Sequence, residues 1–237
     1  VTEYVDDDTV TAGGKEYKYN VVAKQASGIA DFQYTLKDEY DFYLDSNGNV
    51  LYAEGVEADG SYVYISEFFK DGNSTRADKK AYAYFLDGTD KTITLNKVDG
   101  TKVSNLSLAG GTGYASTLGT KATGWYRYSE KTDGKYDLTS VSGQVTASTV
   151  NSDVTDYSAQ KTNIVVGGTT LKGNASTKFV VIKANDDVVT YTGIKSVADI
   201  TTGTAGVVVT AVRDGSTNYA KYVFIDVGTN GVVKGGN

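Results

Sequence analysis

The sequence predicts an all-β protein of two small antiparallel β-domains, barrel- or sandwich-like, with at most one or two short helices. Its 237 residues include 19 Tyr and are rich in Val and Thr, the side chains that strands prefer. Asp-Gly and Asn-Gly dipeptides, which accept the positive φ of tight turns, recur between alternating apolar and polar segments. These features together indicate many short strands joined by hairpins.

The clearest predicted hairpin covers residues 40–54, with Asn47-Gly48 as a two-residue turn. Such a turn sets the cross-strand partners, because a slip of one residue would exchange the two faces of the sheet. The expected pairs are Leu44 with Leu51, Phe42 with Ala53, and Tyr43 with Tyr52.

Three further alternating segments, residues 61–65, 80–86 and 91–95, predict a meander. Residues 100–123 are rich in Gly, Thr, Ser and Lys and are interpreted as a linker or long loop. A boundary near residue 120 follows, which gives domains 1–120 and 121–237.

The second predicted domain begins with a hairpin around Thr132-Asp133-Gly134. A three-residue loop ending in a Gly bulge would place Tyr126, Tyr128 and Leu138 on one face. Residues 179–182 (FVVI) are apolar on both faces, as a central strand would be.

Two smaller expectations concern the same half of the chain. Residues 194–200 (IKSVADI) have apolar residues at helical spacing and predict one short helix that caps a barrel. Lys178 and Lys183 are expected on edge strands, where Lys limits unwanted sheet pairing.

The composition excludes several classes of chemistry. The chain has no Cys, His, Met or Pro, so disulfides, thiolate or His catalysis and Cys- or His-ligated metals are ruled out. A net charge of −6 with scattered basic residues disfavours nucleic acid, and no apolar run approaches a membrane span. We expect neither a nucleic-acid partner nor membrane insertion.

The start at Val1 without Met suggests a mature product or an excised piece.

Acidic residues are the remaining candidates for catalysis or metal binding. Asp38, Glu39, Asp41 and Glu54 could pair for glycoside hydrolysis, although acids beside turns are usually solvated. We assign no catalytic residue and expect no enzyme.

Calcium is an open alternative without a complete motif. Asp45–Asn49 begins like a calcium loop, but Val50 replaces the Gly at position six and Val56 the Glu at position twelve. Two acidic clusters are Asp6–Asp8 and Asp186-Asp187. They could bind calcium at domain junctions, or they could simply be solvated turns. We assign no metal-binding and no cofactor-binding residue.

Several segments resemble the repeated β-regions of bacterial surface-layer proteins, of the Firmicutes type that carries surface-layer homology domains elsewhere in the chain. They are residues 40–54 (YDFYLDSNGNVLYAE), 61–65 (SYVYI), 94–100 (TLNKVDG), 125–141 (WYRYSEKTDGKYDLTSV) and 189–200 (VTYTGIKSVADI). The helical wall-anchoring modules of that family have no counterpart in these 237 residues.

The resemblance implies an extracellular, cell-wall-associated, non-enzymatic structural module that acts in envelope assembly and display. Its implied partners are further copies or neighbouring surface-protein domains. The alternative is an adhesin or carbohydrate-binding module that recognises wall or host glycans, and this alternative predicts an exposed aromatic patch around Trp125, the single Trp of the chain.

Overall fold

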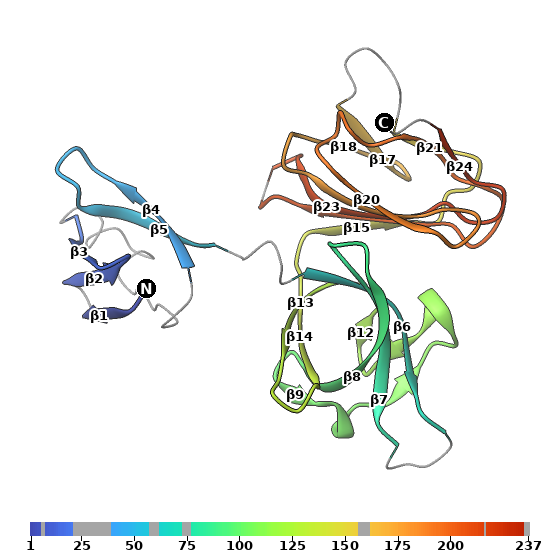
Figure 1. The fold of residues 1–237 in the computed structure, drawn as a ribbon, viewed down its shortest axis with the longest axis horizontal. Coiled ribbons are helices and arrows are strands. Elements are labelled where there is room, and N and C mark those ends of the chain that lie inside the picture. Colours follow the sequence, from blue (N-terminus) through green and yellow to red (C-terminus); the bar gives the residue numbers. More distant parts are fainter. Residues whose placement is uncertain are drawn as a thin grey trace. The chain divides into compact units, whose positions relative to one another are not determined.

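The computed structural model describes residues 1–5, 8–20, 39–56, 62–72, 77–155, 162–215 and 217–234 (Figure 1). The chain forms two compact units, Val1–Gly60 and Ser61–Asn237. Antiparallel strands dominate both, and the helical turns of the described residues are two short 3-10 segments, η2 (Val103–Asn105) and η3 (Gly113–Ala115). The all-β prediction is confirmed. None of the helical segments within these ranges is long and apolar enough to cross a membrane.

The first unit contains a three-stranded sheet and a separate hairpin. Val10, Tyr19 and Val50 form its small core, and the ring of Tyr17 lies 5.6 Å from that of Phe42. The strands are β1 (Glu3–Val5), β2 (Thr9–Ala12), β3 (Lys15–Lys18), β4 (Glu39–Leu44) and β5 (Val50–Val56).

The β4–β5 hairpin is the one predicted at residues 40–54, with one difference in register. Phe42 pairs with Ala53 and Tyr43 with Tyr52, as expected. Leu44 pairs with Val50 instead of Leu51, because a bulge follows Tyr43. Gly48 donates to the Asp45 carbonyl and has a φ of 82°, so the loop is longer than two residues and ends in a Gly bulge. The predicted two-residue turn is therefore wrong.

The second unit begins with a closed five-stranded Greek-key barrel (Figure 1). The first three strands form the predicted meander, and a later hairpin returns to pair antiparallel with β6 and parallel with β8, which closes the barrel. Gly134 has a φ of 75° in this hairpin, and Tyr126, Tyr128 and Leu138 all pack toward the barrel core as predicted. The barrel strands are β6 (Tyr62–Lys70), β7 (Lys79–Phe85), β8 (Asp90–Val98), β13 (Gly124–Glu130) and β14 (Tyr136–Ser140), with the short β9 (Thr101–Lys102) at the edge.

Residues 100–123, interpreted above as a linker or long loop, belong to the barrel. Val103 and Leu118 are buried in its core, and three short strands form a small sheet beside it. Since β13 pairs with β6, one sheet joins strands from both sides of residue 120, and the chain divides at residues 60–61 instead. The small sheet consists of β10 (Leu108–Ala109), β11 (Thr117–Leu118) and β12 (Lys121–Ala122).

The rest of the second unit is a sandwich of two five-stranded sheets, which we call the inner and the outer sheet (Figure 1). The inner sheet, in spatial order, is β15 (Gln144–Ala147), β22 (Val208–Arg213), β23 (Ala220–Asp226), β19 (Lys178–Ile182) and β20 (Val188–Thr192). The outer sheet is β18 (Thr169–Lys172), β17 (Asn163–Val166), β16 (Asp153–Thr155), β21 (Asp199–Thr201) and β24 (Val232–Lys234).

Two predictions for this region are wrong. Residues 194–200 form a single turn and the start of β21, because Ser196 closes a turn on the Gly193 carbonyl and Ile200 then pairs in the outer sheet with Thr155 and Val233. Lys178 begins β19, which lies between β23 and β20, and Lys183 follows directly after it. Neither Lys therefore protects an edge strand.

The three central strands of the inner sheet, β22, β23 and β19, are buried on both faces. Phe179 and Val181 of β19 point into the sandwich core, whereas Val180 and Ile182 point into a second cluster shared with the barrel. The prediction that residues 179–182 form a central strand is confirmed. The barrel wall thus provides a third layer over the sandwich.

Candidate functional site at the junction of barrel and sandwich

A cluster of aromatic side chains joins the barrel to the inner sheet, and we call it the aromatic junction. On β6, Val63 and Ile65 point into the barrel while the alternate residues point outward. On β23 the same alternation sends Val223 and Ile225 into the sandwich and the aromatic residues toward the barrel. The junction consists of Tyr62 and Tyr64 (β6), Trp125 (β13), and Tyr222 and Phe224 (β23), with Tyr84 and Tyr114 packed against them.

The rings of the aromatic junction are in close contact. Tyr64 stacks on Phe224 with centroids 3.6 Å apart and an interplanar angle of 5°. Trp125 meets Tyr64 edge-on at 5.6 Å, and Tyr62 lies 4.2 Å from Tyr222. Each such pair adds about 0.5–1.5 kcal/mol to what burial alone provides.

The polar atoms within the junction are paired. The hydroxyls of Tyr64 and Thr210 lie 3.2 Å apart, and the indole N–H of Trp125 donates to the Thr210 carbonyl at 3.3 Å. Thr210 also bonds Thr146 of the neighbouring strand, at 3.1 Å between hydroxyls. Pairing of this kind removes the penalty for burying polar groups.

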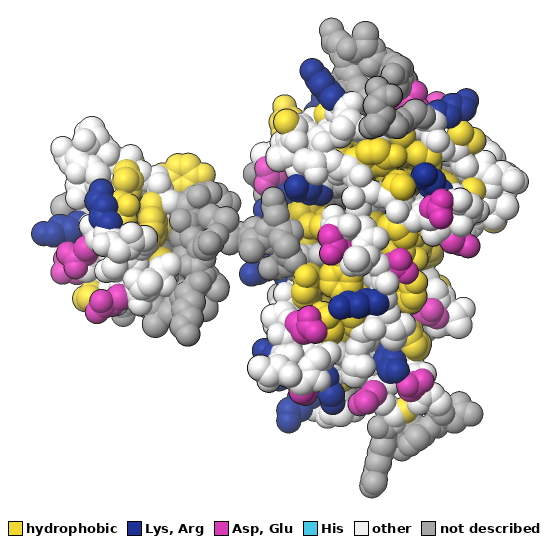
Figure 2. Space-filling model, viewed as in Figure 1, with side chains coloured by type: hydrophobic (Ala, Val, Ile, Leu, Met, Phe, Trp, Pro, Cys, Tyr) yellow, Lys and Arg dark blue, Asp and Glu magenta, His cyan; other side chains and the backbone are white. Residues whose placement is uncertain are grey.

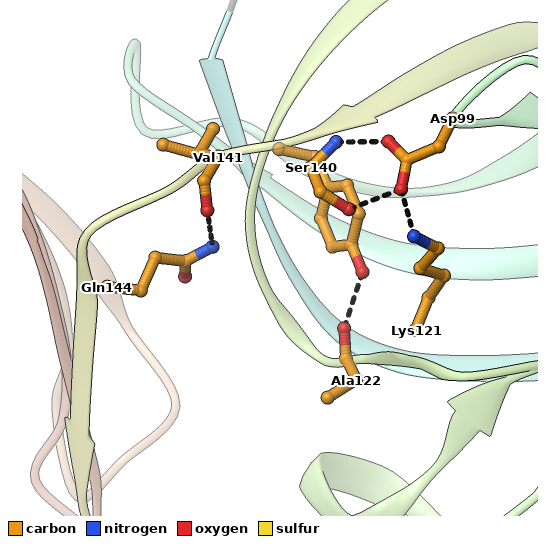
Figure 3. A network of polar contacts seen from close by, with 7 residues as sticks. Asp99, Lys121, Ala122, Ser140, Val141 and Gln144 are labelled. Atoms are coloured by element: carbon orange, nitrogen blue, oxygen red, sulfur yellow. Dashed lines mark hydrogen bonds and ion pairs between the residues drawn. The ribbon is translucent and has the colours of Figure 1, made fainter.

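Gln144 connects the barrel to the segment that leads into the sandwich. Its amide accepts from the Trp125 backbone N–H at 2.8 Å and donates to the Trp125 carbonyl at 2.9 Å, much as a neighbouring strand would. It also donates to the Val141 carbonyl at 3.0 Å (Figure 3). Gly124 leaves room for this amide, since a Cβ there would lie 2.7 Å from the Gln144 side-chain oxygen.

A second polar network fixes the end of β14, where the chain leaves the barrel (Figure 3). Asp99 accepts from the Ser140 backbone N–H at 2.6 Å and from its hydroxyl at 2.8 Å, and it forms an ion pair with Lys121. Burial raises the pKa of Asp99, but the bonds from Lys121 and Ser140 outweigh this effect and leave the pKa below its ordinary value. The carboxylate therefore stays charged and holds three segments together.

Asp226 and Tyr114 form the polar rim of the junction. The Tyr114 hydroxyl donates to the Asp226 carboxylate at 2.5 Å. Burial raises the pKa of Asp226 above its ordinary value, and burial together with the Asp226 charge raises the pKa of Tyr114. Because burial also raises the pKa of Tyr64, these phenols remain neutral near pH 7 and provide hydrogen bonds rather than bases.

Trp125 is 0% exposed, which overturns the expected surface patch. A sugar ring cannot stack on an indole that already contacts Tyr64 and Tyr222 inside the junction. The sequence signal for Trp125 was correct in marking an aromatic cluster, and wrong in placing that cluster at the surface.

The acidic candidates near the first hairpin are partly outside the described residues. Asp38 lies outside them, and so do the side chains of Glu39, Asp41 and Glu54. The backbone pairing places Asp41 opposite Glu54 across the hairpin.

The calcium candidates have different outcomes. Asp45 accepts hydrogen bonds from the amides of Asn49 and Asn47 and from the Asn20 side chain, and these bonds lower its pKa to about 2. Its carboxylate is thus used in closing the turn. Asp186 and Asp187 lie in the β19–β20 turn, whereas Asp6 and Asp7 are outside the described residues. No group of three or more acidic side chains in the described ranges is arranged to hold a metal ion.

Sequence reasoning missed the junction, although one signal pointed to it. Residues 179–182 and 207–209 are apolar on both faces, and a sheet buried on both faces requires a third layer. Alternating Tyr residues at 62 and 64 could have provided that layer. Comparisons of the chain with protein-family models, with curated proteins and with solved structures found no match.

Proposed function

We propose that the chain is a non-enzymatic structural module of a bacterial cell-surface protein, of the surface-layer kind, and that it acts outside the cell in envelope assembly and display. The observation that carries this proposal is the aromatic junction, which fuses barrel and sandwich through fully buried rings. The resemblance of the strand-and-turn segments to surface-layer β-regions supports the location.

The junction suits a module that must keep its shape under load. A hinge motion between barrel and sandwich would expose Trp125, Tyr64 and Phe224 to water. The free-energy cost would be about 1.5–3 kcal/mol for each large side chain. It would also break the bonds of Gln144 to Trp125. Barrel and sandwich therefore act as one rigid body.

The composition supports the same role. Without His, the protein changes its charge little between about pH 5 and 8, and without Cys or Met it presents few oxidisable side chains. Such a module keeps its stability in an environment that the cell does not buffer.

Two experiments test the proposal. Immunogold electron microscopy of intact source cells, with an antibody against residues 61–237, is expected to label the outer surface. Sedimentation and electron microscopy of the full-length parent protein, titrated with calcium, are expected to show ordered assemblies. Label confined to the cell interior, or a parent protein that stays monomeric throughout, would contradict the proposal.

The adhesin alternative loses the feature that distinguished it, because Trp125 is buried. A glycan that changed the Trp fluorescence of the folded chain would restore it, and we expect no such change.

A further inference from the structure

The outermost strand of the inner sheet, β20, has one unpaired edge. It pairs with β19 on one side, and no strand pairing among the described residues uses its other side. Its sequence, VVTYT, contains neither charge nor Pro, the two usual means by which edge strands avoid pairing. The edge strands of the outer sheet do carry a charge, since β18 ends in Lys172 and β24 in Lys234.

The backbone groups that this edge offers follow from the hairpin geometry. Lys183 donates to the Asp187 carbonyl, so the next pair, Ile182 and Val188, is not hydrogen-bonded. Alternation along the antiparallel ladder then turns the N–H and C=O groups of Val188, Thr190 and Thr192 away from β19. The Thr192 carbonyl already accepts from the Ser196 hydroxyl. The N–H groups of all three residues and the carbonyls of Val188 and Thr190 therefore form the row of donors and acceptors for an added strand.

A pocket of about 390 Å³ continues this edge at its C-terminal end. Thr192 belongs to both, since it lies on the unpaired edge and lines the pocket. Ile194 and Gly173, which are buried, and Ala175, which is exposed, supply apolar surface. Gly173 approaches Ile194 so closely that a Cβ there would lie 2.6 Å from the Ile194 Cβ. The pocket can accept an apolar side chain from a strand that runs along β20.

The other end of the edge is acidic. Asp186 and Asp187 are exposed in the turn that precedes β20. The β7–β8 turn adds exposed Asp87 and Asp90, and its Gly88 lies against Thr190, with a Cβ position 3.3 Å from the Thr190 methyl group. A basic side chain of the added strand would find opposite charge at this end.

We propose that β20 binds an extended segment of another polypeptide chain by strand addition, with an apolar side chain in the pocket and a basic side chain near Asp186 and Asp187. Backbone bonds to the edge supply affinity, and the pocket and the carboxylates supply specificity. The inference rests on the proposed function only for the source of the segment, which would be a neighbouring surface-protein domain.

A second copy of β20 fits this edge less well. Antiparallel pairing of two β20 strands about Thr190 would place both barrels on the same face of the joined sheet. The two β7–β8 turns, with Asp87 and Asp90 on each, would then face one another at close range. Like charges in that position disfavour the symmetric pair.

The test uses two capped peptides as probes, acetyl-Leu-Thr-Val-Thr-Val-Thr-Lys-amide and the same residues in reverse order. Titration of the ¹⁵N-labelled chain is expected to shift the amide signals of Val188, Thr190 and Thr192 with at least one peptide. Thr190→Pro removes an outward N–H that β19 does not use, and Ala175→Phe fills the pocket from an exposed position. Each variant is expected to weaken binding at least tenfold.

Thr170→Pro on the β18 edge is the matched control, and it should bind like the unaltered chain. Retained binding in both Thr190→Pro and Ala175→Phe would overturn the proposal, as would the absence of shifts at Val188, Thr190 and Thr192 with both peptides at millimolar concentration. Concentration-dependent self-association that Thr190→Pro abolishes would assign the edge to a second copy and overturn it too. If the peptides do not bind but the antibody still labels the cell surface, the strand-addition proposal is overturned and the proposed function stands.

Discussion

The tyrosines of β6 and those of the β4–β5 hairpin occupy similar strand positions and have opposite environments. Tyr62 and Tyr64 are each 1% exposed, whereas Tyr43 and Tyr52 are 52% and 47% exposed. In both strand pairs the Tyr residues have apolar neighbours in the sequence. The alternating pattern therefore predicts the strand, and the layer that packs on its outer face decides whether the ring is buried.

Ring contacts in the two regions differ for the same reason. Tyr43 and Tyr52 lie 5.7 Å apart on an exposed face, where water competes with the contact. Tyr64 stacks on Phe224 at 3.6 Å within a buried cluster. The same kind of ring contact should therefore contribute less to the free energy of unfolding in the hairpin than in the junction. Matched substitutions in the two regions test this difference.

The largest expected effect is the replacement of Trp125. Trp125→Ala removes a fully buried indole and should lower the free energy of unfolding by about 3–5 kcal/mol. Tyr52→Ala, the exposed counterpart, should change it by no more than about 0.5 kcal/mol. Urea unfolding followed by circular dichroism measures both. Equal effects of the two substitutions would remove the distinction between the regions.

Gln144 should come next. Gln144→Ala leaves the buried backbone N–H of Trp125 without its acceptor and should destabilise the second unit by about 1–3 kcal/mol. Gln144→Glu keeps this acceptor but places a carboxylate oxygen against the Trp125 and Val141 carbonyls, so an effect at least as large is expected. Urea unfolding is again the measurement, and an alanine variant as stable as the unaltered chain would show that the bridge is dispensable.

The local parts of the fold were predictable because their determinants lie close together in the sequence. The pairs Phe42–Ala53 and Tyr43–Tyr52 follow from one turn, and the face shared by Tyr126 and Leu138 follows from another. The Leu44–Leu51 pair failed since a bulge near the turn shifts the register without changing the pattern.

The non-local parts were not predictable. Pairing of β6 with β13 joins residues about sixty positions apart, and no local pattern marks it. The Gly-rich composition of residues 100–123 resembled a linker, although Leu118 is buried in the barrel. The junction was missed because Tyr occurs on solvent-exposed and on buried faces of strands, so its position in the sequence does not predict burial.

A smaller effect is expected from single hydroxyl groups. Tyr64→Phe removes the bond to Thr210 and should destabilise the second unit by about 0.5–1.5 kcal/mol, while Thr210 keeps its bond to Thr146. Tyr43→Phe removes an exposed hydroxyl and should have no measurable effect. Thermal unfolding compares the two, and a larger shift in the Tyr43 variant would contradict the assigned burial.

The smallest effects concern pH, and they have opposite signs in the two regions. The pKa of Asp45 is lowered to about 2 in the folded hairpin, so its contribution is present above pH 3.8 and is lost as pH falls toward 2. Burial raises the pKa of Asp226, so the junction gains stability as this carboxyl protonates and loses it as pH rises above 3.8.

Carboxyl carbon shifts in an NMR titration would measure both groups directly. Asp45 should titrate below the ordinary Asp range and Asp226 above it. The same midpoint for both carboxyls would contradict the hydrogen bonding of the turn and the burial of the junction.

The central claim is that the aromatic junction makes barrel and sandwich one cooperative body, and native-state hydrogen exchange tests it most directly. Amides of Val63 and Ile65 report on the barrel core, and those of Val181 and Val223 on the sandwich core. We predict one common free energy of opening for all four, which Trp125→Ala should split into two values. A barrel that opens at a lower free energy than the sandwich in the unaltered chain would contradict the claim.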